Sequence, residues 1–154
     1  MARQSFFAEM RSGKNDPNFF KNMKMSELRK NVRRIIIDIK YDNISMIDYS
    51  YFQNETIIDA CMQECMHQSD EVRATLNALN SYYNDLKNRR YVPYYNFDLF
   101  KEMTDVSEKI REFTDKYYLW YNLYTAFYCI RYCNAEIHSV MGAIRLMNFD
   151  PSDL

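Results

Sequence analysis

The fold of this chain is decided by residues 113–147, FTDKYYLWYNLYTAFYCIRYCNAEIHSVMGAIRLM. Nine of the first twenty positions are aromatic, and neither proline nor glycine interrupts them. Because proline and glycine are the residues that most often break a helix, this stretch is typical of a long helix. Its aromatic surface must be removed from water, so other elements have to pack against it.

The composition excludes folds with many turns. The chain of 154 residues contains two glycines and three prolines, whereas β-sandwiches and doubly wound α/β proteins need many turn residues. Hydrophobic residues make up 47% of the chain, which is more than a disordered chain carries. We therefore expect an all-α protein of three to four helices with few connections.

Apolar residues spaced by three and four predict two long helices, over 54–90 and 98–147. The short connection at 91–97 favours a long antiparallel helical hairpin. With a turn centred near residue 94, facing positions sum to about 189, and this hairpin is the predicted core. The predicted pairs are Val72 with Tyr117, Leu76 with Phe113, Leu79 with Ile110, and Tyr83 with Val106. The second helix has two candidate breaks, at Thr114-Asp115 and at a change of apolar phase near 124–126.

Residues 26–40 fit two structures. Leu28, Val32 and Ile39 have helical spacing, and we favour a helix here followed by an extended or irregular segment over 43–53. The alternative is a short β-hairpin near 35–51, because apolar residues also alternate there around a possible turn.

Three parts of the chain are expected: an irregular N-terminal arm at 1–25, a single helical domain at 26–147, and an exposed acidic C-terminal tail at 148–154. The phenylalanines of the arm are Phe6, Phe7, Phe19 and Phe20. Because these rings are poorly soluble in water, they favour docking of the arm onto the body or onto a neighbour.

Charge is distributed unevenly along the chain. Residues 1–41 hold ten Lys/Arg and four Asp/Glu, a balance of +6, whereas 42–115 hold seven basic and fourteen acidic residues, a balance of −7. The basic group consists of Lys21, Lys24, Arg29, Lys30, Arg33 and Arg34. It is either a solvated helix face or a patch that contacts nucleic acid or the acidic part of another copy.

No membrane or export signal is visible. The N-terminal residues lack the apolar centre of a signal peptide, and the longest uncharged stretch, 117–130, is too short to span a bilayer. We expect a soluble, intracellular protein in a reducing compartment, or one assembled into a particle made there.

Four cysteines form two Cys-x3-Cys pairs, Cys61 with Cys65 and Cys129 with Cys133. The pattern resembles the twin Cys-x3-Cys helical hairpins of small mitochondrial translocase chaperones, but the resemblance covers these four residues only, and 63 residues separate the two pairs here. A shared metal site or two disulfides would require a hairpin register about five residues, or about 7 Å, away from the predicted one. We therefore expect buried free thiols, with no metal and no cofactor.

No catalytic motif stands out. Glu64 and His67 have the Glu-x-x-His spacing of di-iron bundles, but Ala135 lies three positions before His138, so the second motif is missing. Two histidines and two glycines leave neither a visible nucleophilic triad nor a phosphate-binding loop. We expect a protein that is not an enzyme.

Aromatic residues cover several sides of the long C-terminal helix, so more than one face needs a partner. The candidate partner-binding residues are Tyr117, Tyr118, Trp120, Tyr121, Tyr124 and Tyr128. We expect a structural, assembly or protein–protein interaction subunit of a larger complex, forming a homo-oligomer or binding other subunits. Small helical connector and adaptor subunits of virus particles have this general character. The alternatives are a nucleic-acid-associated or regulatory protein acting through residues 21–34, and a thiol-based metal or redox protein.

Overall fold

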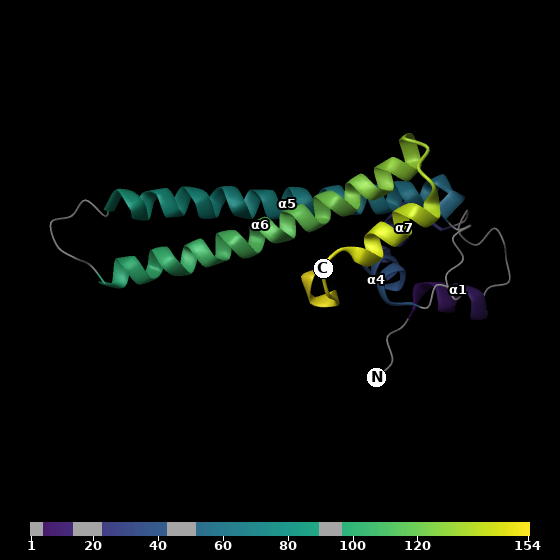
Figure 1. Cartoon of the computed structure of the whole chain (residues 1–154), viewed down its shortest axis with the longest axis horizontal. Helices are drawn as coiled ribbons and strands as arrows, with labels where there is room; N and C mark the ends of the chain where they lie inside the picture. The colour runs from purple at the N-terminus through teal and green to yellow at the C-terminus, as the bar shows by residue number, and fades with distance from the viewer. Residues whose placement is uncertain (1–4, 14–22, 43–51, 90–96) are drawn as a thin grey trace. The chain divides into compact units, whose positions relative to one another are not determined.

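The computed structural model describes residues 5–13, 23–42, 52–89 and 97–154 (Figure 1). None of these residues lies in a β-strand, so the all-α prediction is confirmed. The helices are α1 (Phe6–Gly13), α3 (Met25–Lys30), α4 (Val32–Tyr41), α5 (Glu55–Arg89), α6 (Phe97–Tyr132), α7 (Ile137–Leu146) and the short 3-10 helix η3 (Pro151–Asp153). In the described ranges, every helix is too short or too polar to cross a membrane.

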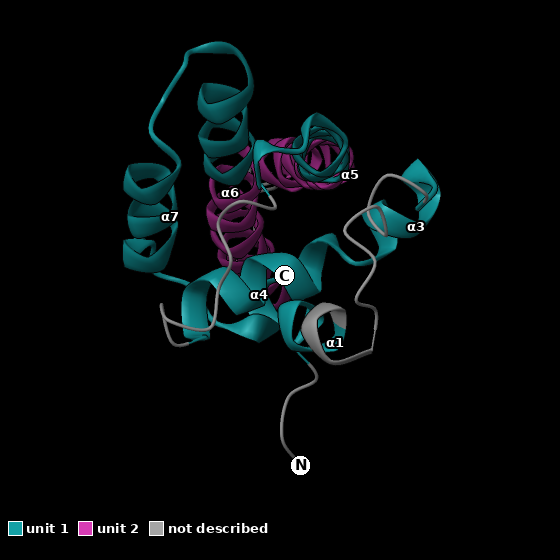
Figure 2. Ribbon diagram, turned by 90° about the vertical axis from the view of Figure 1, so that its right-hand side faces the viewer, with its two compact units in different colours: residues 1–66, 122–154 teal, residues 67–121 magenta. Residues whose placement is uncertain are grey.

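The chain divides into two compact units, and α5 and α6 each contribute to both (Figure 2). Unit 1 lies within residues 1–66 and 122–154, and unit 2 comprises residues 67–121.

Helix α4 is the central element of unit 1, where α1, α3 and α7 all contact it (Figure 2). Its apolar residues Val32, Ile35 and Ile39 are fully buried, as their helical spacing predicts. The helix predicted for 26–40 is therefore confirmed, with an interruption at Asn31 between α3 and α4. The first strand of the alternative β-hairpin is therefore a wrong prediction, because these residues are helical. Its second strand, at 43–51, lies outside the described residues.

The start of α1 is held against α4 by two carboxylates. The backbone N–H of Phe7 donates to buried Asp38 at 3.1 Å, and the Ser5 hydroxyl donates to Asp42 at 2.8 Å. Phe6 and Phe7 are both buried, and the Phe7 ring meets that of Phe52 edge-on at 5.6 Å. These contacts hold the first phenylalanine pair of the arm against α4 and Phe52 of the same unit. The pair Phe19, Phe20 lies outside the described residues.

Helix α5 begins where the sequence predicts. The Asn54 side chain accepts a hydrogen bond from the backbone N–H of Thr56 at 2.9 Å, which satisfies one of the N–H groups that a helix start leaves without a partner.

Helix α6 runs without a break through both predicted break points, which are therefore wrong. The Thr114 hydroxyl donates to the Ile110 carbonyl at 2.6 Å, a bond compatible with a continuous helix. The helix ends instead at Tyr132. Two residues later Asn134 has a φ of 55° in the left-handed region, and the following N–H of Ala135 donates back to the Cys129 carbonyl at 3.1 Å. Asparagine is the residue after glycine that best tolerates this conformation.

The C-terminal tail is only partly exposed, contrary to expectation. Phe149 is buried, and its carbonyl accepts a hydrogen bond from the Tyr41 hydroxyl at 3.1 Å. Beyond it, Asp150 and Asp153 close η3 with a reciprocal capping box, and Pro151 is exposed. The apolar ring in the tail explains the difference, because a charge count alone overlooks it.

Unit 2 is the predicted antiparallel hairpin, formed by the parts of α5 and α6 that lie in residues 67–121 (Figure 1). Its buried cluster consists of Leu86, Met103 and Val106, with Leu79, Tyr83, Leu99 and Ile110 packed against it. Both members of two predicted pairs, Leu79 with Ile110 and Tyr83 with Val106, belong to this cluster. The hydrophobic core of the hairpin is nevertheless smaller than the core of unit 1. Of the twelve largest fully buried side chains among the described residues, only Leu86 and Trp120 belong to unit 2.

Candidate partner-binding surface

A row of three tyrosines occupies successive turns of α6 in unit 1. The ring centroids of Tyr124 and Tyr128 are 6.0 Å apart, and those of Tyr128 and Tyr132 are 5.1 Å apart. Residues four apart lie on one face of a helix, so the spacing itself builds this tyrosine row. Tyr128 is 41% exposed and Tyr132 is 58% exposed. Large apolar rings on solvent are typical of surfaces that bind another protein.

Arg131 fixes one end of the tyrosine row to α5. Its Nε donates to Asp59 at 3.0 Å, and its Nη2 lies 3.5 Å from a carboxylate oxygen of Glu55. The hydrogen bond to Asp59 raises the pKa of Arg131 above its ordinary value. The same guanidinium stands 4.9 Å from the centroid of the Tyr132 ring. A positioned cation over the ring restricts the ring, so this end of the row is preorganised.

A second group of tyrosines lies on α6 within unit 2. Tyr117 is half-buried, and its ring stacks on that of Tyr121 with the centroids 6.1 Å apart. The Tyr118 ring meets the Tyr117 ring edge-on, with the centroids 5.7 Å apart. Tyr118 and Tyr121 are exposed. These contacts use part of each ring and leave the rest accessible to solvent.

The six predicted partner-binding residues therefore separate by burial. Trp120 is 1% exposed, so it is a core residue and its assignment to the partner-binding surface is wrong. Tyr117 and Tyr124 are half-buried, whereas Tyr118, Tyr121 and Tyr128 are exposed. Sequence reasoning missed Tyr132, the most exposed member of the row, although its spacing of four from Tyr128 is visible in the sequence.

Among the described residues of the basic group, all three arginines bond to other parts of unit 1. Arg29 pairs with Glu64 at 3.2 Å, Arg34 pairs with Glu9, and Arg33 donates to the backbone carbonyl of Leu154 at 2.7 Å. Lys24 and Lys30 are exposed, and Lys21 lies outside the described residues. The acidic partners come from elements far away in sequence, so three of the predicted patch residues are engaged inside unit 1.

The four cysteines are free thiols in two different environments. Cys61 and Cys65 are buried, and their burial raises the pKa of both thiols. Cys129 is half-buried and Cys133 is exposed, so the expectation of four buried thiols is wrong for the second pair. Nowhere in the described ranges do three His, Cys, Asp or Glu side chains gather in a way that could hold a metal ion.

Comparison with protein-family models, with curated proteins and with solved structures finds no match to this chain.

Proposed function

We propose that this protein is a non-enzymatic interaction subunit that uses the tyrosine row of α6 to bind another protein within a larger complex. The observation that carries the proposal is the exposure of Tyr128 and Tyr132, whose ring centroids lie 5.1 Å apart, with Arg131 over the Tyr132 ring. Tyrosine and arginine are enriched among the residues that contribute most to protein–protein binding.

The chemistry of the row suggests the kind of partner surface. Each tyrosine offers an apolar ring together with a hydroxyl that donates or accepts a hydrogen bond. A complementary surface would therefore be apolar at its centre and carry polar groups at its edge. Such a subunit would suit an assembly role, and a connector or adaptor of a virus particle is one setting for it.

Photo-cross-linking in the cell that makes the protein tests this proposal. A benzophenone amino acid at position 128 is expected to give a discrete adduct with one protein, and adding the Tyr132→Ser change is expected to reduce its yield at least about fivefold. The same probe at exposed Gln63 of unit 1 is the matched control. A set of adducts that is the same at positions 128 and 63 would contradict the proposal.

A second variant separates the tyrosine row from exposed tyrosines in general. Tyr118→Ser combined with Tyr121→Ser removes two exposed rings of unit 2 and leaves the row intact. We expect this variant to retain the adduct at position 128. Loss of the adduct in this variant would assign the binding to the tyrosines of unit 2 instead.

The nucleic-acid alternative has less support, because Arg29, Arg33 and Arg34 each bond within unit 1. Among the described residues of the predicted patch, Lys24, Lys30 and Arg33 are exposed. Retention of the purified protein on DNA or RNA, lost on changing both lysines to glutamate, would favour that alternative over the tyrosine row.

A further inference from the structure

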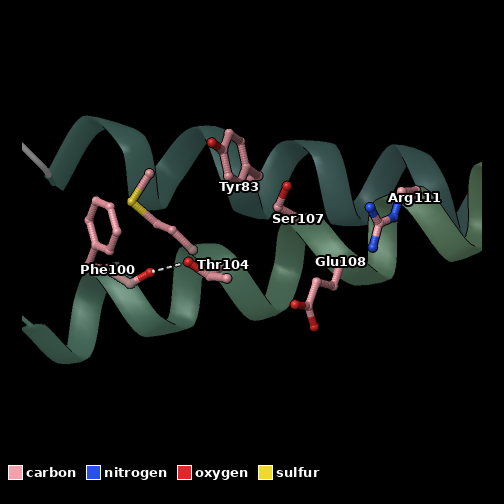
Figure 3. Close-up of a pocket in the computed structure, with 7 residues that line it drawn as sticks. Tyr83, Phe100, Thr104, Ser107, Glu108 and Arg111 are labelled. Atoms are coloured by element: carbon pink, nitrogen blue, oxygen red, sulfur yellow. Dashed lines mark hydrogen bonds between the residues drawn. The ribbon is translucent and has the colours of Figure 1, made fainter.

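An open groove of about 480 Å³ lies on one side of the unit 2 hairpin (Figure 3). Half-buried Tyr83 of α5 and buried Met103 of α6 give it apolar walls, and the exposed ring of Phe100 stands at one end. Glu108 and Arg111, one turn apart on α6, line it toward the other end. The groove thus combines an apolar surface with one charge of each sign.

A stripe of exposed residues on α6 includes three that line this groove, Thr104, Glu108 and Arg111. Its members are Lys101, Thr104, Glu108, Arg111, Asp115 and Tyr118, and all six are exposed. Their spacing alternates three and four, which is the spacing of side chains that face a partner helix.

The stripe matches itself when it is read in the opposite direction. When two copies of the helix are placed antiparallel with their midpoints between residues 109 and 110, Glu108 of one copy lies opposite Arg111 of the other. In the same register Lys101 lies opposite Tyr118. In a pair of antiparallel helices the first combination would be an ion pair and the second a cation–π contact, and a two-fold axis would form each of them twice. Charge complementarity therefore identifies a second copy of this helix as the occupant.

The small core of the hairpin supports the same occupant. Three side chains of its cluster are buried, while Tyr83 and Ile110 are among four hydrophobic residues that are only partly buried. Two helices cover one stripe of each other, and a second copy on the groove side would cover Tyr83, the partly buried residue of this cluster that lines the groove.

We propose that the groove side of unit 2 is a self-association surface on which the α6 helices of two copies pack antiparallel across a two-fold axis near residues 109 and 110. The inference rests on the proposed role as an interaction subunit and adds a second copy of the chain as one partner. It uses a different surface from the tyrosine row.

The mass of the full chain in solution, measured by sedimentation equilibrium over a range of concentrations, tests the proposal. The wild type is expected to approach twice the chain mass of 18.7 kDa. Glu108→Arg and Arg111→Glu each place like charges opposite one another, and each should raise the dimer dissociation constant about tenfold or more. Combining the two changes restores opposite charges and should return the constant to within about threefold of wild type.

Two exposed residues off the stripe supply matched controls. Asp105→Arg and Lys109→Glu make the same changes of charge on another side of α6, and both should leave the dissociation constant unaltered. A wild type that stays monomeric throughout, or a double swap that fails to restore the dimer while its circular dichroism equals that of wild type, would overturn the proposal.

The two proposals fail separately. A monomeric wild type that still forms the adduct at position 128 would remove the self-association surface and leave the tyrosine row. A wild type that forms the dimer but no adduct at position 128 would remove the tyrosine row and leave the self-association surface. Tyr128→Ser combined with Tyr132→Ser is expected to keep the dimer, because both residues lie in unit 1.

Discussion

Lys40 and Arg145 cap the ends of each other's helices in unit 1. The Lys40 Nζ at the end of α4 donates to the Arg145 carbonyl at 3.1 Å and to the Met147 carbonyl, at the end of α7. In return, Nη1 of Arg145 donates to the carbonyls of Ile39 at 2.8 Å and Asp42 at 2.7 Å, at the end of α4. The last carbonyls of a helix lack intrahelical partners and carry the negative end of its dipole. Two cations thus stabilise both ends and fasten α7 to α4.

Removing either cation should destabilise unit 1. Lys40→Met and Arg145→Met are each expected to lower the free energy of unfolding by about 1–3 kcal/mol, because two carbonyls lose a charged donor. Urea titrations followed by circular dichroism measure this loss. The double variant should lose less than the sum, since the two residues share one contact region.

The control for these caps is Lys24→Met. Lys24 is exposed at the start of α3, so its replacement should change the free energy of unfolding by less than about 0.5 kcal/mol. Losses in the two cap variants that do not exceed the loss in this control would show that the reciprocal caps contribute nothing measurable.

The buried carboxylate of Asp38 should hold α1 in place. Asp38→Ala leaves the Phe7 N–H without this acceptor and is expected to lower the free energy of unfolding by about 1–3 kcal/mol. Proteolysis within α1 should become faster, because the arm is then released more often. Asp38→Asn keeps an oxygen acceptor and should cost less than alanine. Equal losses for alanine and asparagine would assign the effect to the charge of Asp38 and not to its hydrogen bond.

Thiol reactivity should divide the four cysteines into two pairs. The thiolate is the reactive form, and burial both raises the pKa of Cys61 and Cys65 and blocks access to them. An aromatic disulfide reagent at neutral pH is expected to label Cys129 and Cys133 at least about tenfold faster than the buried pair. Changing both of these residues to serine should remove the fast phase. Four equal rates in the native protein would contradict the burial of the first pair.

The sequence predicted local structure well where a single side chain or one periodic stripe decides it. Asn54 caps α5 at the start of the predicted helix, and the pairing of Leu79 with Ile110 agrees with the buried cluster of the hairpin. The end of α6 was missed because it depends on one left-handed residue, Asn134, with neither glycine nor proline to mark it. The predicted change of apolar phase near 124–126 is absent from the burial pattern, because Leu123 and Phe127 of unit 1 follow the buried Trp120 of unit 2 at spacings of three and four.

The candidate site was predictable only as a concentration of aromatic residues. Composition and spacing do not say which ring becomes core, and so Trp120 was assigned to the surface while Tyr132 was left out. The contacts of the basic patch could not be predicted for a related reason. Its arginines find Glu64 and Glu9 through tertiary contacts between distant segments, which periodicity within one helix cannot reveal.

The buried thiols also predict how stability depends on pH. Because burial raises the pKa of Cys61 and Cys65, both stay protonated in the folded chain where an unfolded thiol, with a pKa near 8.5, ionises. The unfolded state then binds fewer protons, so the stability due to these thiols is complete below about pH 8.5 and falls as the pH rises above it.

Urea titrations at several pH values between about 8 and 10 measure this alkaline loss. Changing Cys61 and Cys65 to alanine should lower stability throughout, because it leaves cavities, but should make the alkaline slope shallower by up to about 1.4 kcal/mol per pH unit for each thiol. Changing Cys129 and Cys133 to serine is the matched control and should leave the slope closer to that of wild type. An alanine variant whose slope equals the wild-type slope would show that the two thiols are not kept protonated by the fold.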